Sequence, residues 1–372
     1  MKDHFVITIG GANLEHFVRI EKRHLEIGVK HSISPTQIFA GGSAVVHACR
    51  LLATGIQVIP IIPIVNDFGG NIIKKNIEFH SKKGGVDCFE KKLFMKKFDM
   101  TTSIATIFSL DNLKTIYTDH SSINSEEFSK YCFSKINILN SKLAIKNVKS
   151  KIAIIGHIHA DNFVTGKKGE ITRSTINTLK EANFFILANF GSSQYNKGYL
   201  YWSPTLEKIH CFQLNIREIK VFMSASEIQS DFTLKKTFDL FRNKCTVIIT
   251  LGKMGTIAQV KHSNSIIFSW PYKLDNDEII DTTGAGNSMI AGIASYLVEH
   301  QIETDEHMSL ALTRGTLWSA FACTQMGSSD NCPNNSELNH FRMKHQLLRN
   351  VEIKNIEDSI RDLEKLEDLF KK

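Results

Sequence analysis

No uninterrupted apolar segment of this sequence reaches the length of about 18 residues that a membrane-spanning helix needs. The apolar stretch at the N-terminus, Phe5 to Ile9, is too short for a signal peptide. Internal repeats and low-complexity tracts are absent as well. We therefore expect a cytoplasmic globular protein without a membrane partner.

Paired cysteines are also lacking. The seven cysteines are an odd number, and none stands in a CxxC pair or at the spacing of a metal site. Free thiols in a reducing cytoplasm are the simplest interpretation. No Ser/His/Asp or Cys/His spacing indicates a nucleophilic enzyme either.

The formal charge of +7 is not gathered into a nucleic-acid-binding patch. The densest basic group, Lys91 and Lys92 with Lys96 and Lys97, is short and has no interleaved aromatic residues. Solvated lysines explain it, and we expect no nucleic-acid partner. The 372 residues are 42% hydrophobic and 22% charged, which is ordinary for a globular enzyme with one large core or two moderate ones.

Strand-length apolar runs recur between helical stretches, and each is bounded by Gly, Asn, Asp or Pro. Runs that are apolar on both faces are typical of a parallel sheet covered by helices, so the pattern predicts a doubly wound α/β fold. The runs are Phe5 to Ile9, Val58 to Val65, Lys151 to Ile155, Phe184 to Leu187 and Thr246 to Leu251.

Two segments depart from this pattern. Residues 101–118 alternate polar and apolar side chains around a turn at Asp111 and Asn112, which predicts a half-exposed antiparallel hairpin, such as a lid. Residues 336–372 are charged and helical in pattern, with Ile353, Ile356 and Ile360 among the apolar positions. We expect the latter segment to be an amphipathic helical extension.

The stretch 281–287, DTTGAGN, predicts a phosphate-binding loop. A strand-like Ile279 and Ile280 enter it, and a helix leaves it. Gly284 and Gly286 let the backbone approach a ligand closely, and the free amides of the helix's first turn stabilise an anion. The alternative is a tight turn whose glycines serve packing alone.

Five further segments, together with this loop, resemble the ribokinase-like family, the PfkB carbohydrate kinases. In order they are IGGANLE, which contains Glu15; GGSAVVHACRLLATG, which contains Gly41, Gly42 and Val46; IVNDFGG; the NxxE motif with Asn215 and Glu218; and ITLGKMG, with Thr250, Gly252 and Gly255. The resemblance implies a three-layer α/β/α kinase domain over residues 1–335. It also implies a mostly parallel sheet and a small β lid, with lid strands within about 13–40 and 95–120.

The resemblance also implies roles for these residues. Thr250, Gly252 and Gly255, with Asn215 and Glu218, would bind ATP, and Glu218 and Asn215 would order Mg²⁺ through water. An amide and a carboxylate three residues apart suit a hydrated cation, although any surface helix could carry them. Glu15, Gly41, Gly42, Val46 and Asp281 would lie at the acceptor. Gly284, Ala285 and Gly286 would form the anion hole.

Asn287 stands where the family has the Asp that takes the proton of the acceptor hydroxyl. A carboxamide can hold that hydroxyl but cannot accept its proton. An engineered trap, natural loss of activity and a relocated base are the competing explanations. Asp281 is the nearest other carboxylate, but its place before the turn favours a structural anchor.

The acceptor side departs from the family pattern as well. Glu15 replaces an Asp and Val46 an Asn, and the latter change would disfavour a polyhydroxylated sugar. A loop glutamate and a core valine are the structural alternatives.

Two hypotheses follow. The first is an ATP- and Mg²⁺-dependent phosphotransferase acting on a hydroxymethyl group of a sugar or nucleoside, with weakened catalysis. The second is a catalytically impaired pseudokinase that senses nucleotide or sugar. In either case the resemblance implies that the lid could form a homodimer.

Overall fold

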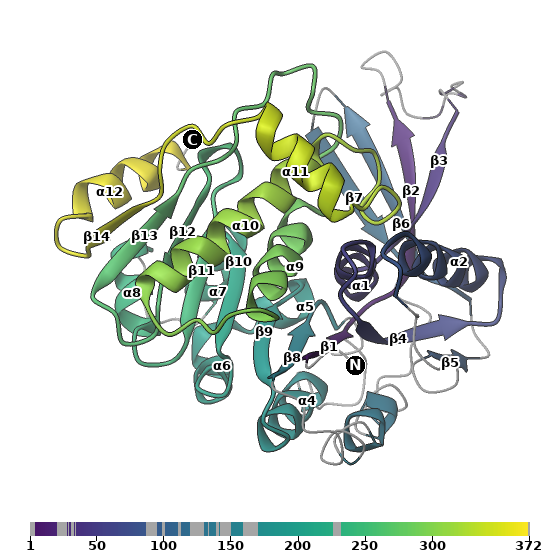
Figure 1. The fold of residues 1–372 in the computed structure, drawn as a ribbon, viewed down its shortest axis with the longest axis horizontal. Helices are drawn as coiled ribbons and strands as arrows, with labels where there is room; N and C mark the ends of the chain where they lie inside the picture. Colours follow the sequence, from purple (N-terminus) through teal and green to yellow (C-terminus); the bar gives the residue numbers. More distant parts are fainter. Residues whose placement is uncertain are drawn as a thin grey trace.

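The computed structural model describes residues 4–20, 35–86, 95–98, 101–110, 113–119, 150–158, 170–225 and 232–370, with a few residues in 28–33 and 130–141. A ten-stranded sheet runs through the body (Figure 1). Its strands, in spatial order, are β14 (Glu352–Asn355), β13 (Ser265–Ser269), β12 (Thr256–Gln259), β11 (Thr246–Thr250), β10 (Cys211–Asn215), β9 (Phe185–Asn189), β8 (Ser150–Ile155), β1 (His4–Ile9), β4 (Val58–Val65) and β5 (Met95–Phe98).

Seven of these strands, from β5 to β11, are parallel, and β12 to β14 continue the sheet antiparallel. All five predicted apolar runs are strands of the parallel part. The prediction of a mostly parallel central sheet is therefore confirmed.

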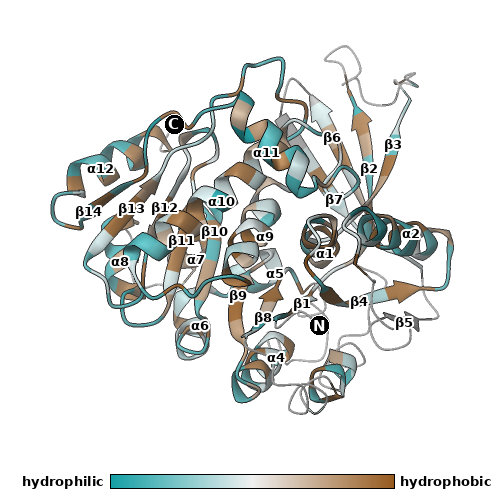
Figure 2. Cartoon of the chain, viewed as in Figure 1, coloured by the Kyte–Doolittle hydropathy of each residue, from teal (hydrophilic) through white to brown (hydrophobic). Residues whose placement is uncertain are grey.

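Helices cover both faces of the sheet because its strands are apolar on both sides. Along β8, Ile152 and Ile154 join one buried cluster while Ala153 and Ile155 join the other. Figure 2 shows the central strands as the most hydrophobic part of the molecule, with hydrophilic residues on the outer sides of the helices. The chain is thus a three-layer α/β/α structure.

Each cluster belongs to one helical layer. The first layer contains α1 (Ser43–Ala53), α2 (Phe68–Lys83), α9 (Ala285–Leu297), α10 (Asp305–Cys323) and α11 (Asn335–Lys344). The second contains α4 (Glu170–Glu181), α5 (Ser192–Tyr195), α6 (Gly198–Leu206), α7 (Ile216–Ser224), α8 (Leu234–Phe241) and α12 (Ile360–Leu369).

A smaller sheet stands at one side of the body (Figure 1). It consists of β3 (Gln37–Gly41), β2 (Asn13–Arg19), β6 (Ile104–Leu110) and β7 (Leu113–Thr118), in that order. The predicted hairpin is present as β6 and β7, which pair antiparallel up to Leu110 and Leu113. Within the predicted lid range 95–120, however, β5 pairs with β4 and belongs to the large sheet.

The C-terminal segment differs from a purely helical extension. Ile353 lies in β14, which pairs antiparallel with β13 and so extends the large sheet. Ile356 is buried beyond that strand, and Leu363 and Leu366 of α12 belong to the hydrophobic core. The spacing of three and four residues was a helical signal only from Ile360 onward, because Ile353 lies within β14 and Ile356 lies in the turn that follows it.

Two of the absences noted in the sequence bear on the structure. Among the described residues, no helix combines the length and the apolarity that crossing a membrane requires. Every cysteine in the described part is a free thiol, and burial raises the pKa of Cys132, Cys211, Cys245 and Cys332.

Candidate active site

The loop 281–287 leads into α9, as predicted. Gly284 is the residue before the helix and has a left-handed φ of 78°, which favours glycine. A Cβ on Gly284 would also lie 2.7 Å from Cβ of Ser328. The strand-like entry is wrong, because Ile279 and Ile280 are exposed and outside any strand.

The first turn of α9 offers free amides. Within the described chain, the N–H groups of Gly286 and Asn287 have no hydrogen-bond acceptor, and no side chain caps the helix. A Cβ on Gly286 would be in ordinary van der Waals contact with Nε2 of Gln213, at 3.7 Å, so a methyl group would fit beside this residue. Free donors at the positive end of a helix dipole fit an anion such as a phosphate.

Asp281 holds the loop in place. Its Oδ1 accepts from the amide of Thr283 at 2.8 Å, and its Oδ2 accepts from the amide of Gly327 at 3.4 Å. The carboxylate is buried, at 3% exposure. These contacts fit a structural anchor, which was the alternative to a role of Asp281 at the acceptor.

Glu15 is buried at 7% exposure, so a solvated loop glutamate is excluded. It lies on β2, and its two oxygens accept from Oγ of Ser328 at 2.8 and 2.7 Å. A Cβ on Gly41 would stand 2.5 Å from the Glu15 carboxyl carbon. Glycine at position 41 therefore makes room for this side chain, and Ser328 lies between Glu15 and Gly284.

Gly42 and Val46 belong to the start of α1. Gly42 has a φ of 94°, and a Cβ there would be 2.4 Å from the carbonyl oxygen of Gly11, so this position requires glycine. Val46 is fully buried, which fits the interpretation of this residue as a core position.

Asn215 and Glu218 form a capping box at the start of α7. Oδ1 of Asn215 accepts from the amide of Glu218 at 2.9 Å, while Oε2 of Glu218 accepts from the amide of Asn215 at 2.9 Å. Burial raises the pKa of the Glu218 carboxyl to about 7. The pair therefore has a structural task of its own, and an adjacent cation would favour the ionised form of Glu218.

The other residues predicted for nucleotide binding follow β11. Thr250 ends this strand and pairs with Asn215 of β10, so the two residues lie side by side. Gly252 opens the short 3₁₀ helix η3 (Gly252–Met254) and is exposed. Gly255 has a φ of 95°, and a Cβ there would meet the carbonyl oxygen of Ser269 at 2.3 Å.

A chain of polar side chains that sequence reasoning did not assemble runs beneath the first turn of α9. The side chain of Gln213 on β10 donates to the carbonyl of Gly286 at 3.5 Å. The side chain of Asn189 in turn donates to the backbone oxygen of Gln213 at 3.2 Å. Oδ1 of Asn189 in turn meets Nε2 of His157 at 2.9 Å.

His47 of α1 continues this row of polar side chains, because it neighbours His157 and Asn287. The signal for Asn189, Gln213 and His157 was present in the sequence, because each lies in or just after the carboxyl-terminal half of a parallel strand, where ligands bind in such folds. The prediction of His157 as a loop or rim residue missed its neighbours, and His159 lies outside the described residues.

These contacts show which predicted residues the fold brings together. Gln213 links β10 to the loop at Gly286, and Asn215 follows two residues later, so the NxxE motif lies near the start of α9. On the other side, Ser328 connects the loop to Glu15. No group of three or more His, Cys, Asp or Glu side chains that could hold a metal ion occurs among the described residues.

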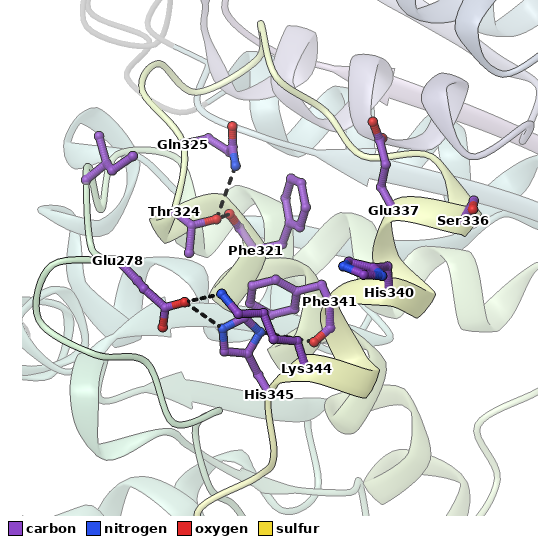
Figure 3. A pocket seen from close by; sticks show the side chains of 11 residues that line it. Glu278, Phe321, Thr324, Gln325, Ser336, Glu337, His340, Phe341, Lys344 and His345 are labelled. Carbon is purple, nitrogen blue, oxygen red and sulfur yellow. Dashed lines mark hydrogen bonds and ion pairs between the residues drawn. The ribbon is translucent and has the colours of Figure 1, made fainter.

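A pocket of about 610 Å³ lies beside this site (Figure 3). The segment 278–280, the end of α10 and α11 form its walls, and none of the predicted site residues lines it. Oε1 of Glu278 accepts from Lys344 at 2.7 Å and contacts His345 at 3.0 Å, which ties the segment before Asp281 to α11.

Comparison with known proteins agrees with the fold. The model of the pfkB family carbohydrate kinases matches residues 139–335, more than half of the chain. No curated protein sequence matches.

Several solved structures resemble the chain over almost its full length. The *Burkholderia thailandensis* nucleoside kinase in complex with inosine has a TM-score of 0.66 and 14% identity, covering 91% of this chain and 96% of its own. The *Methanocaldococcus jannaschii* nucleoside kinase has a TM-score of 0.65 and 18% identity, with coverage of 93% and 99%. The *Arabidopsis thaliana* ribokinase complexed with ribose and ATP has a TM-score of 0.61 and 15% identity, with coverage of 90% and 97%.

Proposed function

Because the chain belongs to the pfkB family of carbohydrate kinases, we propose that it is an ATP- and Mg²⁺-dependent phosphotransferase that phosphorylates a hydroxymethyl group of a sugar or nucleoside. One observation carries the proposal: the unpartnered amides of Gly286 and Asn287 at the start of α9. A row of free donors there fits the negative charge that phosphoryl transfer must stabilise.

The remaining residues suit the same chemistry. Thr250, Gly252 and Gly255 would hold the nucleotide, and Asn215 with Glu218 would order Mg²⁺ through water. ATP bound with Mg²⁺ supplies the phosphoryl group and neutralises part of its charge. Glu218 fits this task in its ionised form, which burial alone disfavours.

The acceptor class rests on the structural relatives, one of which holds inosine and another ribose. In this chain, Glu15 faces Ser328 and the buried Val46 offers no hydrogen bond. Fewer polar partners for an acceptor favour one with an apolar part over a polyhydroxylated sugar.

Catalysis would be weak because Asn287 occupies the position of the family's base. General-base help is worth roughly 10² to 10⁴ in rate, which corresponds to about 3 to 5.5 kcal/mol of barrier. Positioning and charge stabilisation by the helix start remain, so slow turnover is expected.

The test is ATP consumption with a panel of sugars and nucleosides, in wild type and Asn287→Asp. We expect slow turnover in wild type and faster turnover in the variant. Mass spectrometry of the peptide containing Asn287 and Ser288 controls for deamidation, which would create Asp in a fraction of molecules. If Asn287→Asp binds Mg·ATP yet stays inert with every acceptor, the phosphotransferase proposal is wrong.

A second candidate function is a catalytically impaired pseudokinase that binds nucleotide or sugar as a regulatory protein. One observation favours it: both carboxylate oxygens of Glu15 accept from Ser328, so part of their hydrogen-bonding capacity is already used within the protein. It predicts thermal stabilisation by Mg·ATP without turnover in either protein. Absence of stabilisation by any nucleotide, sugar or nucleoside would exclude it.

The smaller sheet, of β3, β2, β6 and β7, could also join two copies of the chain. Ile38 and Tyr117 lie on one face of this sheet, because both are in register with the pair His16 and Thr106, and they are 52% and 64% exposed. Ile104, two residues before Thr106, adds to the same face at 43% exposure. A dimer through this face predicts that Tyr117→Lys lowers the mass measured by sedimentation.

A further inference from the structure

The segment 327–329, which follows α10, is fixed to two strands of the smaller sheet. Ser328 is buried at 1% exposure, and its Oγ lies within hydrogen-bonding distance of both carboxylate oxygens of Glu15 on β2. The next residue, Ser329, donates from its Oγ to the carbonyl oxygen of Ala40 on β3 at 2.6 Å. Any displacement of this segment would therefore be felt by the smaller sheet.

The same segment contacts the loop before α9. A Cβ on Gly284 would lie 2.7 Å from Cβ of Ser328, so the backbone of Gly284 packs directly against this side chain. One residue earlier, the amide of Gly327 donates to Oδ2 of Asp281 at 3.4 Å. The side chain of Ser328 thus meets the smaller sheet with its hydroxyl group and the start of α9 with its Cβ.

Arg50 of α1 holds Ser328 from a third side. Its Nη2 donates to the carbonyl oxygen of Ser328 at 3.1 Å, and the residue is 1% exposed. Within the described chain, Nε and Nη1 of Arg50 have no hydrogen-bond partner. Burying a guanidinium is costly, and a hydrogen bond from a charged donor is about twice as strong as a neutral one. The bond to Ser328 offsets part of that cost and keeps the carbonyl in place.

We propose that Ser328 is a positioning residue, which couples the smaller sheet to the loop before α9 through its hydrogen bond to Glu15. An anion held at the start of α9 would fix Gly284, and with it Ser328 and the carboxylate of Glu15. Order imposed at one end would then lower the cost of ordering the other end, which is a coupling free energy between two sites. The inference rests on the proposed function only in taking Mg·ATP as the ligand of the loop.

The length of the Glu15 side chain makes this contact possible. Aspartate would withdraw the carboxylate by one carbon–carbon bond, about 1.5 Å, which takes its oxygens beyond hydrogen-bonding distance of Ser328. Glutamine keeps the length and one accepting oxygen but loses the charge. The two substitutions therefore separate reach from charge, and we expect the coupling to follow reach.

Hydrogen–deuterium exchange measured by mass spectrometry tests the coupling without turnover and without an acceptor. Saturating Mg·ATP should slow exchange in residues 284–290 of wild type and, through Ser328, should slow exchange in β2 about fivefold or more. Most of the slowing in β2 should be lost in Ser328→Ala and in Glu15→Asp but kept in Glu15→Gln. If Ser328→Ala does not fold, Ser328→Cys replaces it, since a thiol is only a weak donor.

Three outcomes of this experiment overturn the inference. The first is slowed exchange in 284–290 of wild type with none in β2. The second is equal slowing of β2 in wild type and Ser328→Ala. The third is a loss in Glu15→Gln as large as that in Glu15→Asp, which would make the charge of Glu15 decisive instead of its hydrogen bond.

Ser295→Ala is the matched control. Ser295 is also buried, at 3% exposure, but its hydroxyl donates to the carbonyl of Gly292 within its own helix, α9. Its substitution should leave the slowing in β2 as it is in wild type. If Ser295→Ala loses as much of the slowing as Ser328→Ala, removal of any buried hydroxyl has this effect, and the assignment to Ser328 is wrong.

The protein without nucleotide provides a second test. There, Glu15→Asp should speed exchange in 284–290, although it changes a residue of the smaller sheet, and should not do so when Ser328→Ala is already present. No change in 284–290, or the same change in both backgrounds, overturns the inference. If Mg·ATP fails to slow exchange in 284–290 of wild type, the phosphotransferase proposal fails, and this second test decides the coupling alone.

Discussion

Replacing Gly286 by alanine should separate stability from nucleotide binding. The added Cβ would meet its nearest atom, Nε2 of Gln213, at 3.7 Å, which is ordinary van der Waals contact. Alanine is the better helix former by about 0.5–1 kcal/mol within a helix, and by less in the first turn. We therefore expect the free energy of unfolding to stay equal or to rise by up to about 1 kcal/mol.

The same methyl group would stand beside a free amide of the proposed anion site. We expect it to weaken Mg·ATP binding about tenfold, which is about 1.4 kcal/mol. At a concentration of 100 times the wild-type Kd, Mg·ATP stabilises wild type by about 2.7 kcal/mol, and the variant should gain only about 1.4 kcal/mol. Urea unfolding with and without Mg·ATP measures both quantities.

Gly292 of the same helix is the matched control. A Cβ there would lie 2.8 Å from Cα of Gly315 on α10, so the two helices would have to separate. Gly292→Ala should cost about 1–3 kcal/mol of stability but keep the full gain from Mg·ATP. The reasoning about packing is refuted if Gly286→Ala destabilises the apoprotein, and the reasoning about the anion site is refuted if the variant keeps the whole gain of about 2.7 kcal/mol from Mg·ATP.

Three further predictions concern pH and the core. The folded-state pKa of Glu218, about 7, exceeds its unfolded value, so its contribution to stability is present at low pH and is lost as pH rises through 7. In urea unfolding, wild type should therefore lose about 1 kcal/mol of unfolding free energy between pH 6 and 8, and Glu218→Gln should not show this loss. The pKa of His210 is lowered to about 4 by burial, and its Nδ1 accepts from the amide of Ile186. The contribution of His210 to stability is therefore lost as pH falls below 6.5. Between pH 7 and pH 5, the unfolding free energy of His210→Gln should fall by about 1–2 kcal/mol less than that of wild type, a modest value because part of the ring is exposed to water. Leu363→Ala in α12 should cost about 2–5 kcal/mol by thermal or urea unfolding, because Leu363 is 1% exposed, whereas a peripheral extension would lose almost nothing.

Much of the fold could be predicted because its signals are local. Five apolar runs predicted the parallel strands, and glycines at 284 and 286 predicted the turn into α9, since burial and backbone conformation leave clear marks on a sequence. The family resemblance then supplied the order of the layers. Neither source required knowledge of distant contacts.

The errors arose where distant contacts decide the structure. Ile353 forms a strand because β13 offers an open edge, and the short β5 joins β4 instead of the lid. Glu15 is buried because Ser328, 313 residues away, meets its carboxylate. The neighbours of His47 come from α9, from the segment after β8 and from its own helix, so no local pattern could place it beside Asn287.

The most direct test of the central claim compares ATP turnover by wild type and Asn287→Asp at saturating Mg·ATP, across a panel of sugars and nucleosides. The account predicts that Mg·ATP stabilises both proteins and that the variant has the higher kcat with at least one acceptor. A variant that is stabilised by Mg·ATP yet consumes none with any acceptor would contradict it.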